Sequence, residues 1–287
     1  MSSGETAANI LTFDVEEWFH ANYDTVNPDA FRGQGSNFRA QMETLLRMCD
    51  DSGAKATFFV LGCIGEDYPE VIRDIVRQGH EVASHGYSHH LAYRQTRAAF
   101  KADVQKSVAI LEDAAGVRVQ GYRAPSWSIV EANLDYLEAL EELGLTYDAS
   151  IFPVKTFLYG IPQAPLAIHR PRVNGRQLNL YEVPSSVWRL GGKNIGFAGG
   201  FYFRFFPAFF IKQAIRAVNR QGRCGIVYLH PREIDPTERR LTLPPLEAFI
   251  HYCGIGGTKS KLAAMLRTFR FTSVARHLEA MNQLPPG

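Results

Sequence analysis

Two carboxylates stand two residues apart where a short apolar run ends. Asp14 and Glu16 lie in the segment TFDVEEW. Side chains two positions apart on an extended chain point to the same side, so both carboxylates can face one site if the chain turns there. The alternative is a helix N-cap beside a solvated acid. Glu17 has odd spacing from Asp14 and is expected to point elsewhere.

Two histidines four positions apart are the second signal. His85 and His89 lie in SHGYSHH, where one turn of helix would place both imidazoles on the same side. Neutral imidazoles bind divalent metals at about 2.0–2.1 Å, and two of them with one carboxylate leave open positions for water, as in a catalytic site. Surface or core histidines are the alternative, and His90 is expected outside the site.

Three further polar residues end apolar runs. Arg123 in GYRAPSW can hold a carboxylate through a bidentate pair, Asp148 lies in TYDAS, and His230 lies in YLHP. Each has a structural alternative: a surface arginine, a capping aspartate and a structural histidine. Because each residue ends a successive predicted strand, their order favours a shared site.

Apolar runs alternate with amphipathic helical patterns through the first half of the chain. This rhythm predicts parallel strands joined by crossover helices, with the chemistry at the carboxyl ends of the strands. The pattern places strands at residues 10–15, 56–61, 81–84, 119–123 and 147–150, and helices at 37–49, 68–78, 96–115 and 133–143.

The rhythm breaks after Ser150. Residues 151–205 are rich in proline, glycine and aromatic residues, which predicts an irregular insertion with one strand at 180–184. Later patterns predict helices at 206–220, 246–253 and 259–267 and a strand at 225–229, with a helical extension over 240–287. We therefore predict one α/β domain over residues 1–287, a distorted (β/α)7-type barrel of about seven or eight strands.

Composition excludes several classes of protein. With 46% hydrophobic and 21% charged residues among 287, the chain is typical of a globular protein, and its net charge of +2 argues against a nucleic-acid partner. The four cysteines show no CxxC pairing and are expected to be reduced thiols. Residues 1–9 do not look like a secretory signal, and no apolar run is long enough to span a bilayer. A cytoplasmic location is expected, with contact to a membrane surface left open.

The motifs TFDVE, HGYSH, RAPSW, YDAS and YLHP together resemble the polysaccharide deacetylases of carbohydrate esterase family 4, the NodB-homology family. They span a motif core of roughly residues 10–231. The stretch AGGFYFRFFP and the later tail resemble a narrower subfamily encoded beside exopolysaccharide-assembly genes of the exosortase-associated (PEP-CTERM) type. The resemblance implies a distorted (β/α) barrel and a metal-dependent N-deacetylase that acts on an N-acetylated poly- or oligosaccharide in exopolysaccharide biosynthesis.

The resemblance also implies residue roles. Asp14 matches the general base, Arg123 the arginine that orients it, His230 the general acid, and Asp148 the aspartate that tunes that histidine. His85 and His89 match the two metal-binding histidines. The family's usual metal-binding aspartate directly follows the base, a position that Val15 occupies here, so Glu16 is expected to replace it.

The remaining expectations concern metal and substrate. A carboxylate with two histidines suits Zn²⁺, while Co²⁺, Ni²⁺ or Mn²⁺ are alternatives. The backbone N–H of Ser126 is a candidate oxyanion donor, and Trp18, Tyr87 and Trp127 are candidate substrate contacts.

Residues 197–210 (FAGGFYFRFFPAFF) concentrate phenylalanine and tyrosine and leave three interpretations open. They can pack as a lid or core patch, stack on sugar, or meet a membrane surface. The function itself has two alternatives: a C–N hydrolase acting on a small or cyclic amide, and an inactive carbohydrate-binding barrel.

Overall fold

The structure is a computed structural model that describes residues 8–156 and 159–281. The expectations for residues 1–7 and for the last six residues of the predicted extension lie outside this range. No helix within the described residues is long and apolar enough to cross a membrane. All four cysteines are free thiols.

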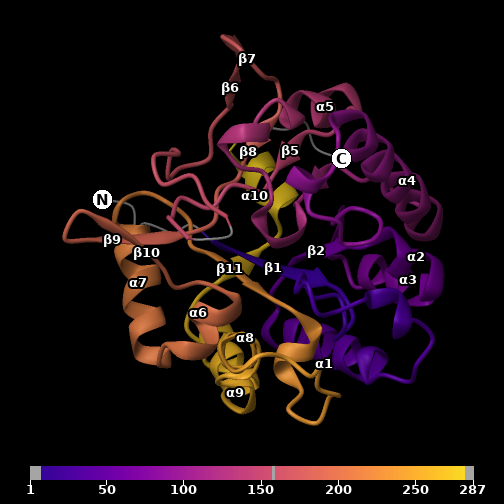
Figure 1. Ribbon diagram of the computed structural model, residues 1–287. Coiled ribbons are helices and arrows are strands. Elements are labelled where there is room, and N and C mark those ends of the chain that lie inside the picture. Colours follow the sequence, from indigo (N-terminus) through magenta and orange to yellow (C-terminus); the bar gives the residue numbers. More distant parts are fainter. Residues whose placement is uncertain (1–7, 157–158, 282–287) are drawn as a thin grey trace.

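A parallel sheet of eight strands forms the centre of the molecule (Figure 1). Its order is β11-β1-β2-β3-β4-β5-β8, and β12 pairs with the start of β1. Every pairing in it is parallel, as the β-then-α rhythm predicted. The strands are β1 Asn9–Val15, β2 Thr57–Val60, β3 Glu81–Ser84, β4 Gly121–Tyr122, β5 Tyr147–Asp148, β8 Tyr181–Glu182, β11 Ile226–Leu229 and β12 Phe271–Thr272.

Helices cover the outer face of this sheet (Figure 1). They are α1 Phe38–Ser52, α2 Gly62–Asp67, α3 Pro69–Arg77, α4 Arg97–Ala115, α5 Tyr136–Glu142, α6 Gly200–Phe205, α7 Ala208–Arg220, α8 Pro245–Tyr252, α9 Ile255–Leu266 and α10 Val274–Ala280. The caps of α4 explain its bounds: the Thr96 side chain accepts from the Ala99 N–H, and Gly116 ends the helix at φ +68°. The predicted distorted (β/α)7-type barrel is confirmed.

The segment between β5 and α7 is irregular, as predicted, but it holds more strands than the sequence indicated. Two small antiparallel hairpins lie in it, β6 Arg172–Val173 with β7 Arg176–Gln177, and β9 Val187–Leu190 with β10 Lys193–Gly196. Short 3-10 helices add turns elsewhere, at Pro28–Ala30, Ala92–Arg94, Pro125–Trp127, Glu131–Asn133 and Pro231–Ile234.

Alternation along β1 sorts its side chains between two environments. Leu11, Phe13 and Val15 belong to the large core between sheet and helices. Ile10 belongs to a separate cluster that also contains side chains of β2, β3, β5 and β11. Because strand side chains alternate, Thr12 and Asp14 share the inward side with Ile10. The same periodicity that buries the apolar residues therefore aims a carboxylate into the barrel.

Two acids, Asp148 and Glu182, are fully buried side by side on the paired strands β5 and β8. Burial and the neighbouring Asp148 carboxylate raise the pKa of Glu182 well above 4.5. A raised carboxyl pKa means that the folded chain binds more protons than the unfolded chain, so stability falls as pH rises from about 4.5 through the folded pKa.

Replacing Glu182→Gln is therefore expected to raise Tm at pH 7–8, by roughly 2–4 °C for each kcal/mol of penalty removed. In the native protein, Glu182 Oε1 accepts a hydrogen bond from the Ile151 N–H at 3.1 Å. The glutamine side chain keeps an oxygen that can accept this bond, and its NH2 group supplies a donor for Asp148. Melting curves from pH 4 to pH 8 test this. The two proteins should melt alike at pH 4, and an equal or lower Tm for the variant at pH 8 would contradict the account.

Candidate metal centre and active site

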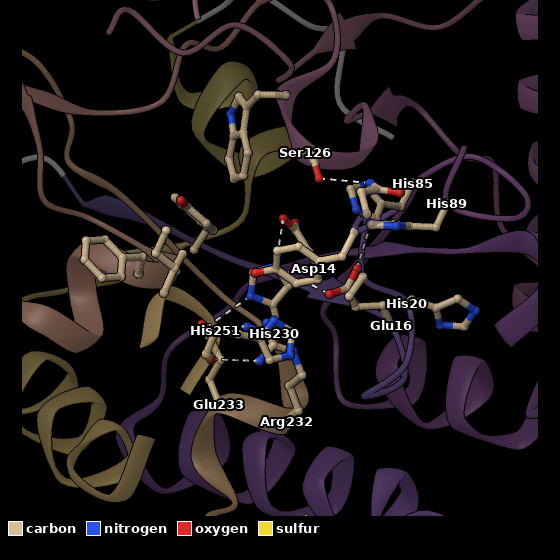
Figure 2. A pocket seen from close by; sticks show the side chains of 18 of the residues that line it. Asp14, Glu16, His20, His85, His89, Ser126, His230, Arg232, Glu233 and His251 are labelled. Atoms are coloured by element: carbon tan, nitrogen blue, oxygen red, sulfur yellow. Dashed lines mark hydrogen bonds and ion pairs between the residues drawn. The ribbon is translucent and has the colours of Figure 1, made fainter. Parts of the chain in front are cut away.

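Glu16, His85 and His89 converge at the carboxyl ends of β1 and β3. One ligand atom from each lies within 4.8 Å of the other two, and all three residues are buried. Figure 2 shows them beside Asp14, facing His230 across the pocket. The carboxylate pair and the histidine pair that the sequence indicated therefore lie at one site.

The local structure behind the histidine pair differs from the expected helical turn. Residues 85–91 form a loop, in which Gly86 has φ +78° and His89 has φ +61°. Several hydrogen bonds hold the loop. Among them, the Gly62 N–H donates to the Gly86 carbonyl at 2.9 Å, and the Tyr87 N–H donates to the Asp103 carboxylate at 2.8 Å. The ring centroids of His85 and His89 lie 5.4 Å apart. A left-handed turn, and not a helix, thus brings the two imidazoles together.

His85 has the tautomer and protonation state that a metal ligand needs. Its Nδ1 lies 2.8 Å from the carbonyl oxygen of Arg123, so Nδ1 carries the proton and Nε2 keeps a free lone pair. Burial lowers the pKa of His85 to about 4, which makes the ring neutral at pH 7. Backbone carbonyls that fix a histidine in this way are a common outer contact of metal-binding imidazoles.

Glu16 supplies the carboxylate. Burial raises its pKa, but His89 and His230 more than offset that effect and hold the pKa of Glu16 below its ordinary range. Its Oε2 lies 2.8 Å from Nε2 of His89, yet within the described part of the chain this oxygen has no partner with hydrogen-bond geometry. A buried anionic oxygen beside two imidazoles, with no hydrogen bond of its own, fits a divalent cation.

Asp14 is held by a buried arginine. Nη1 of Arg123 donates to Oδ1 of Asp14 at 2.6 Å and to the Thr12 hydroxyl at 2.8 Å, and its Nε donates to the Ala149 carbonyl at 3.3 Å. Both partners of the ion pair are 1% exposed. The surface-arginine alternative is therefore wrong, and Arg123 links the carboxyl ends of β1, β4 and β5.

His230 lies across the pocket, directly after β11. Its Nε2 is 3.9 Å from Oδ2 of Asp14 and 3.7 Å from Oε1 of Glu16. Its Nδ1 is 3.2 Å from Oε2 of Glu233, an ion-pair contact without hydrogen-bond geometry. Burial lowers the pKa of His230, but Glu233, Glu16 and Asp14 outweigh burial and raise it above 6.5.

The expectation that Asp148 tunes His230 is corrected here. Asp148 instead accepts from the Ser150 N–H and hydroxyl, at 3.0 and 2.6 Å. Glu233 is the carboxylate beside His230, and sequence reasoning missed it. It is held by the buried Arg204, whose Nε donates to Oε1 at 2.6 Å. The three-residue spacing alone did not predict this contact, because Glu233 returns to His230 only when residues 231–234 form a 3-10 turn.

The pocket at this site has a volume of about 180 Å³ and aromatic walls. Trp127, Tyr159, Phe201 and Tyr228 line it, and the Trp127 N–H donates to Ser185 at 2.8 Å. Ser126 lies at its rim with φ +51°, and its hydroxyl accepts from the Asn22 amide at 3.0 Å. Ser126 and Trp127 thus both line the pocket, and their roles as oxyanion donor and substrate contact stay predictions.

Two expected substrate contacts lie elsewhere. Trp18 packs against Phe19 and Phe31, in a small cluster away from the pocket walls. The Tyr87 hydroxyl donates to Glu66 at 2.7 Å, and Lys106 lies over its ring, 3.3 Å from the centroid. Neither residue lines the pocket, because loop side chains do not follow the alternation that aimed Asp14 inward.

Two further histidines and an arginine also line the pocket: His20, His251 and Arg232. No pattern in the sequence singled these residues out. Burial lowers the pKa of His20 to about 3 and that of His251 to about 2, so both rings are neutral. Nδ1 of His20 accepts from the Glu17 N–H at 3.0 Å, which makes it a structural brace for the loop after β1.

The side chains of the aromatic segment 197–210 lie in three environments: the core, the pocket and the surface. Phe197 and Phe203 are fully buried core residues, as a packing role predicts. Phe201 reaches the pocket, while Phe205 and Phe209 are 54% and 69% exposed. Gly199 permits the close approach of this segment to β11, since a Cβ there would lie 2.1 Å from Cδ1 of Tyr228.

Comparison with known protein families divides the chain in two. Residues 10–147 match the family model for polysaccharide deacetylase, and residues 149–279 match a domain of unknown function, DUF3473. The candidate metal ligands, Asp14 and Arg123 lie in the first part, and His230 and Glu233 lie in the second. The site is thus assembled from both.

Curated relatives match over part of their length. A peptidoglycan deacetylase-like protein of Gibberella zeae is 29% identical over 52% of this chain and 47% of its own. The peptidoglycan deacetylase of Helicobacter pylori is 35% identical over 37% of this chain and 36% of its own. The chain therefore spans less than half the length of these relatives.

Solved structures agree on the fold. A candidate polysaccharide deacetylase from Mycobacterium smegmatis has a TM-score of 0.59 at 19% identity, covering 99% of this chain and 95% of the other. The peptidoglycan deacetylase PdaC from Bacillus subtilis has a TM-score of 0.51 at 16% identity, over 98% and 95% of the two chains. The family model over residues 10–147, the motif order and this barrel agree with one another, so this part of the chain is similar to the polysaccharide deacetylases.

Proposed function

We propose that this protein is a metal-dependent hydrolase that removes acetyl groups from N-acetylated amino sugars. One observation carries the proposal: the convergence of Glu16, His85 and His89 beside the buried Asp14–Arg123 pair. The match of residues 10–147 to the polysaccharide deacetylase family and the similarity to relatives described as peptidoglycan deacetylases support the same reaction class.

Glu16, His85 and His89 would hold the metal. A divalent cation supplies Lewis acidity to an acetamide carbonyl and to the attacking water. Zn²⁺ fits a set of one carboxylate and two neutral imidazoles, while Co²⁺, Ni²⁺ and Mn²⁺ remain alternatives.

Asp14 and His230 would carry the two proton transfers. Asp14 takes the proton of the attacking water, and Arg123 holds the carboxylate in position. His230, kept protonated by Glu233, donates a proton to the departing amine. The Ser126 backbone N–H is the proposed oxyanion donor, and Trp127, Tyr159 and Tyr228 offer aromatic faces to the sugar ring.

Replacing Glu233→Gln is expected to lower the pKa of His230, because it removes the nearby carboxylate that most raises it. The alkaline limb of the kcat/KM profile should then move to lower pH, with a larger loss at pH 8 than at pH 6. Asp148→Asn is the matched comparison, since Asp148 accepts from Ser150 and not from His230. A shift produced by Asp148→Asn but not by Glu233→Gln would reverse the assignment.

Acetate release from N-acetylglucosamine oligomers, measured before and after chelation and metal repletion, tests the function. Metal-dependent release supports the deacetylase. Hydrolysis of small or cyclic amides without release from oligomers would favour the C–N hydrolase instead. Oligomer binding with no hydrolysis of either would favour the inactive carbohydrate-binding barrel.

We further propose a role in exopolysaccharide biosynthesis in the cytoplasm. The support is the resemblance of the stretch AGGFYFRFFP and the later tail to the exosortase-associated subfamily. Contact with a membrane surface is part of this proposal, and exposed Phe205 and Phe209 suit it. Co-sedimentation with liposomes, with and without anionic lipid, tests that contact; no binding in either case would retire it.

A further inference from the structure

A strongly basic groove lies at the amino ends of the strands, away from the candidate active site. It is lined in part by Asn9 at the start of β1 and Phe271 in β12, and its volume is about 830 Å³. Asp14 and Glu16 lie at the opposite, carboxyl end of β1. Six cationic side chains line the groove: Lys55, Arg216, Arg220, Arg267, Arg270 and Arg276.

Among the residues that the structure describes, none that lines this groove carries a carboxyl group. The whole chain has a net charge of only +2, so the six charges are a local concentration and not a reflection of overall composition. Like charges gathered on one surface repel each other, and an anionic ligand relieves that repulsion.

Two of the cations are fixed in place by backbone carbonyls. Nζ of Lys55 donates to the Gln78 carbonyl at 2.7 Å, and Arg276 donates to the Gly79 carbonyl at 3.2 Å. Both head groups therefore lie around Gly79, where a Cβ would be 3.6 Å from Arg276 Nη2 and 3.7 Å from Lys55 Nζ. Burial and then these two charges lower the pKa of the adjacent His80 to about 4, although Asp50 partly opposes them.

The other walls of the groove offer contacts to the uncharged part of an anionic ligand. Arg216 and Arg220 extend from α7, and Arg216 lies 5.9 Å from the centroid of the Phe269 ring. Phe269 and Leu266 add apolar surface, while Asn219 and Thr272 add neutral polar groups. Guanidinium groups are well matched to phosphate oxygens, which they bind bidentately.

We propose that this groove binds a ligand bearing two or more phosphoryl groups. Several cations from separate elements surround a space larger than one phosphate needs, and the apolar wall accommodates whatever the phosphates are attached to. A soluble nucleoside diphosphate and a phosphorylated lipid headgroup present the same chemistry to the groove.

Calorimetric titration of the full chain with inorganic pyrophosphate tests the proposal. The groove variant combines Arg220→Glu with Arg267→Glu, and the control combines Arg73→Glu with Lys193→Glu. All four side chains are exposed. The control pair makes the same change in net charge as the groove pair, but at positions outside the groove. We expect the groove variant to bind at least about tenfold more weakly, the control to bind like wild type, and binding to weaken with salt.

Two further arms distinguish the source of the phosphate. Binding of uridine diphosphate without binding to phosphatidic acid vesicles identifies a soluble ligand, and the reverse identifies a lipid headgroup. No pyrophosphate binding by the wild type would overturn the proposal. Equal binding by the groove variant would also overturn it, because pyrophosphate would then bind outside the groove. Tighter binding of single-stranded RNA than of pyrophosphate, lost in the groove variant, would also overturn it. Acetate release should be the same in all three proteins.

Discussion

Asp14→Asn is expected to lower kcat for deacetylation by about 10²–10⁴-fold, the range that a positioned general base supplies. The amide cannot take a proton from water, yet it matches the carboxylate in shape. Because Asp14 is not among the three proposed metal ligands, metal content should stay at the wild-type level. Acetate release and elemental analysis of the same preparation measure both quantities.

This substitution also removes the negative charge that pairs with a buried guanidinium, which costs stability. Arg123 keeps Thr12 and the Ala149 carbonyl as acceptors, so the variant should fold, with a lower Tm. Melting curves therefore accompany the kinetics. A folded, metal-loaded variant with kcat within tenfold of wild type would show that another group is the base.

His85→Ala has the second large expected effect, through the metal. Removing one of three protein ligands should weaken metal affinity by more than ~100-fold, since even outer contacts of such ligands are worth about 10–100-fold. Acetate release should fall with it and recover only partly at high metal concentration. Metal titration followed by elemental analysis measures the affinity.

His90→Ala is the matched control for this change. His90 is an exposed histidine in the same loop and does not belong to the ligand cluster. It should leave metal content and turnover unchanged. If both histidine variants kept their metal, or both lost it, the ligand assignment would fail.

Much of this architecture could be predicted from the sequence because strand periodicity determines the side of the sheet to which each side chain points. Alternation along residues 10–15 separates Asp14 from Phe13, and the β-then-α rhythm places the end of each strand at one edge of the sheet. Those two regularities sufficed to predict that Asp14, Arg123 and His230 share a site.

The features of the site that the sequence did not predict depend on the conformation of turns and loops. Glu233 reaches His230 only because residues 231–234 close into a 3-10 turn, and no periodicity announces that turn. The left-handed backbone at Gly86 and His89 replaces the helical turn expected there. Trp18 and Tyr87 lie in loops, where spacing alone does not decide whether a ring faces the pocket or the core.

Anomalous X-ray scattering at the zinc edge, from crystals grown without added metal or chelator, tests the central claim most directly. The account predicts one peak in contact with Glu16 and the Nε2 atoms of His85 and His89, at distances of about 2.0–2.2 Å. Should crystals with added Zn²⁺, Co²⁺, Ni²⁺ or Mn²⁺ also lack a peak there, with Glu16 turned away from both histidines, the metal-dependent hydrolase would be contradicted.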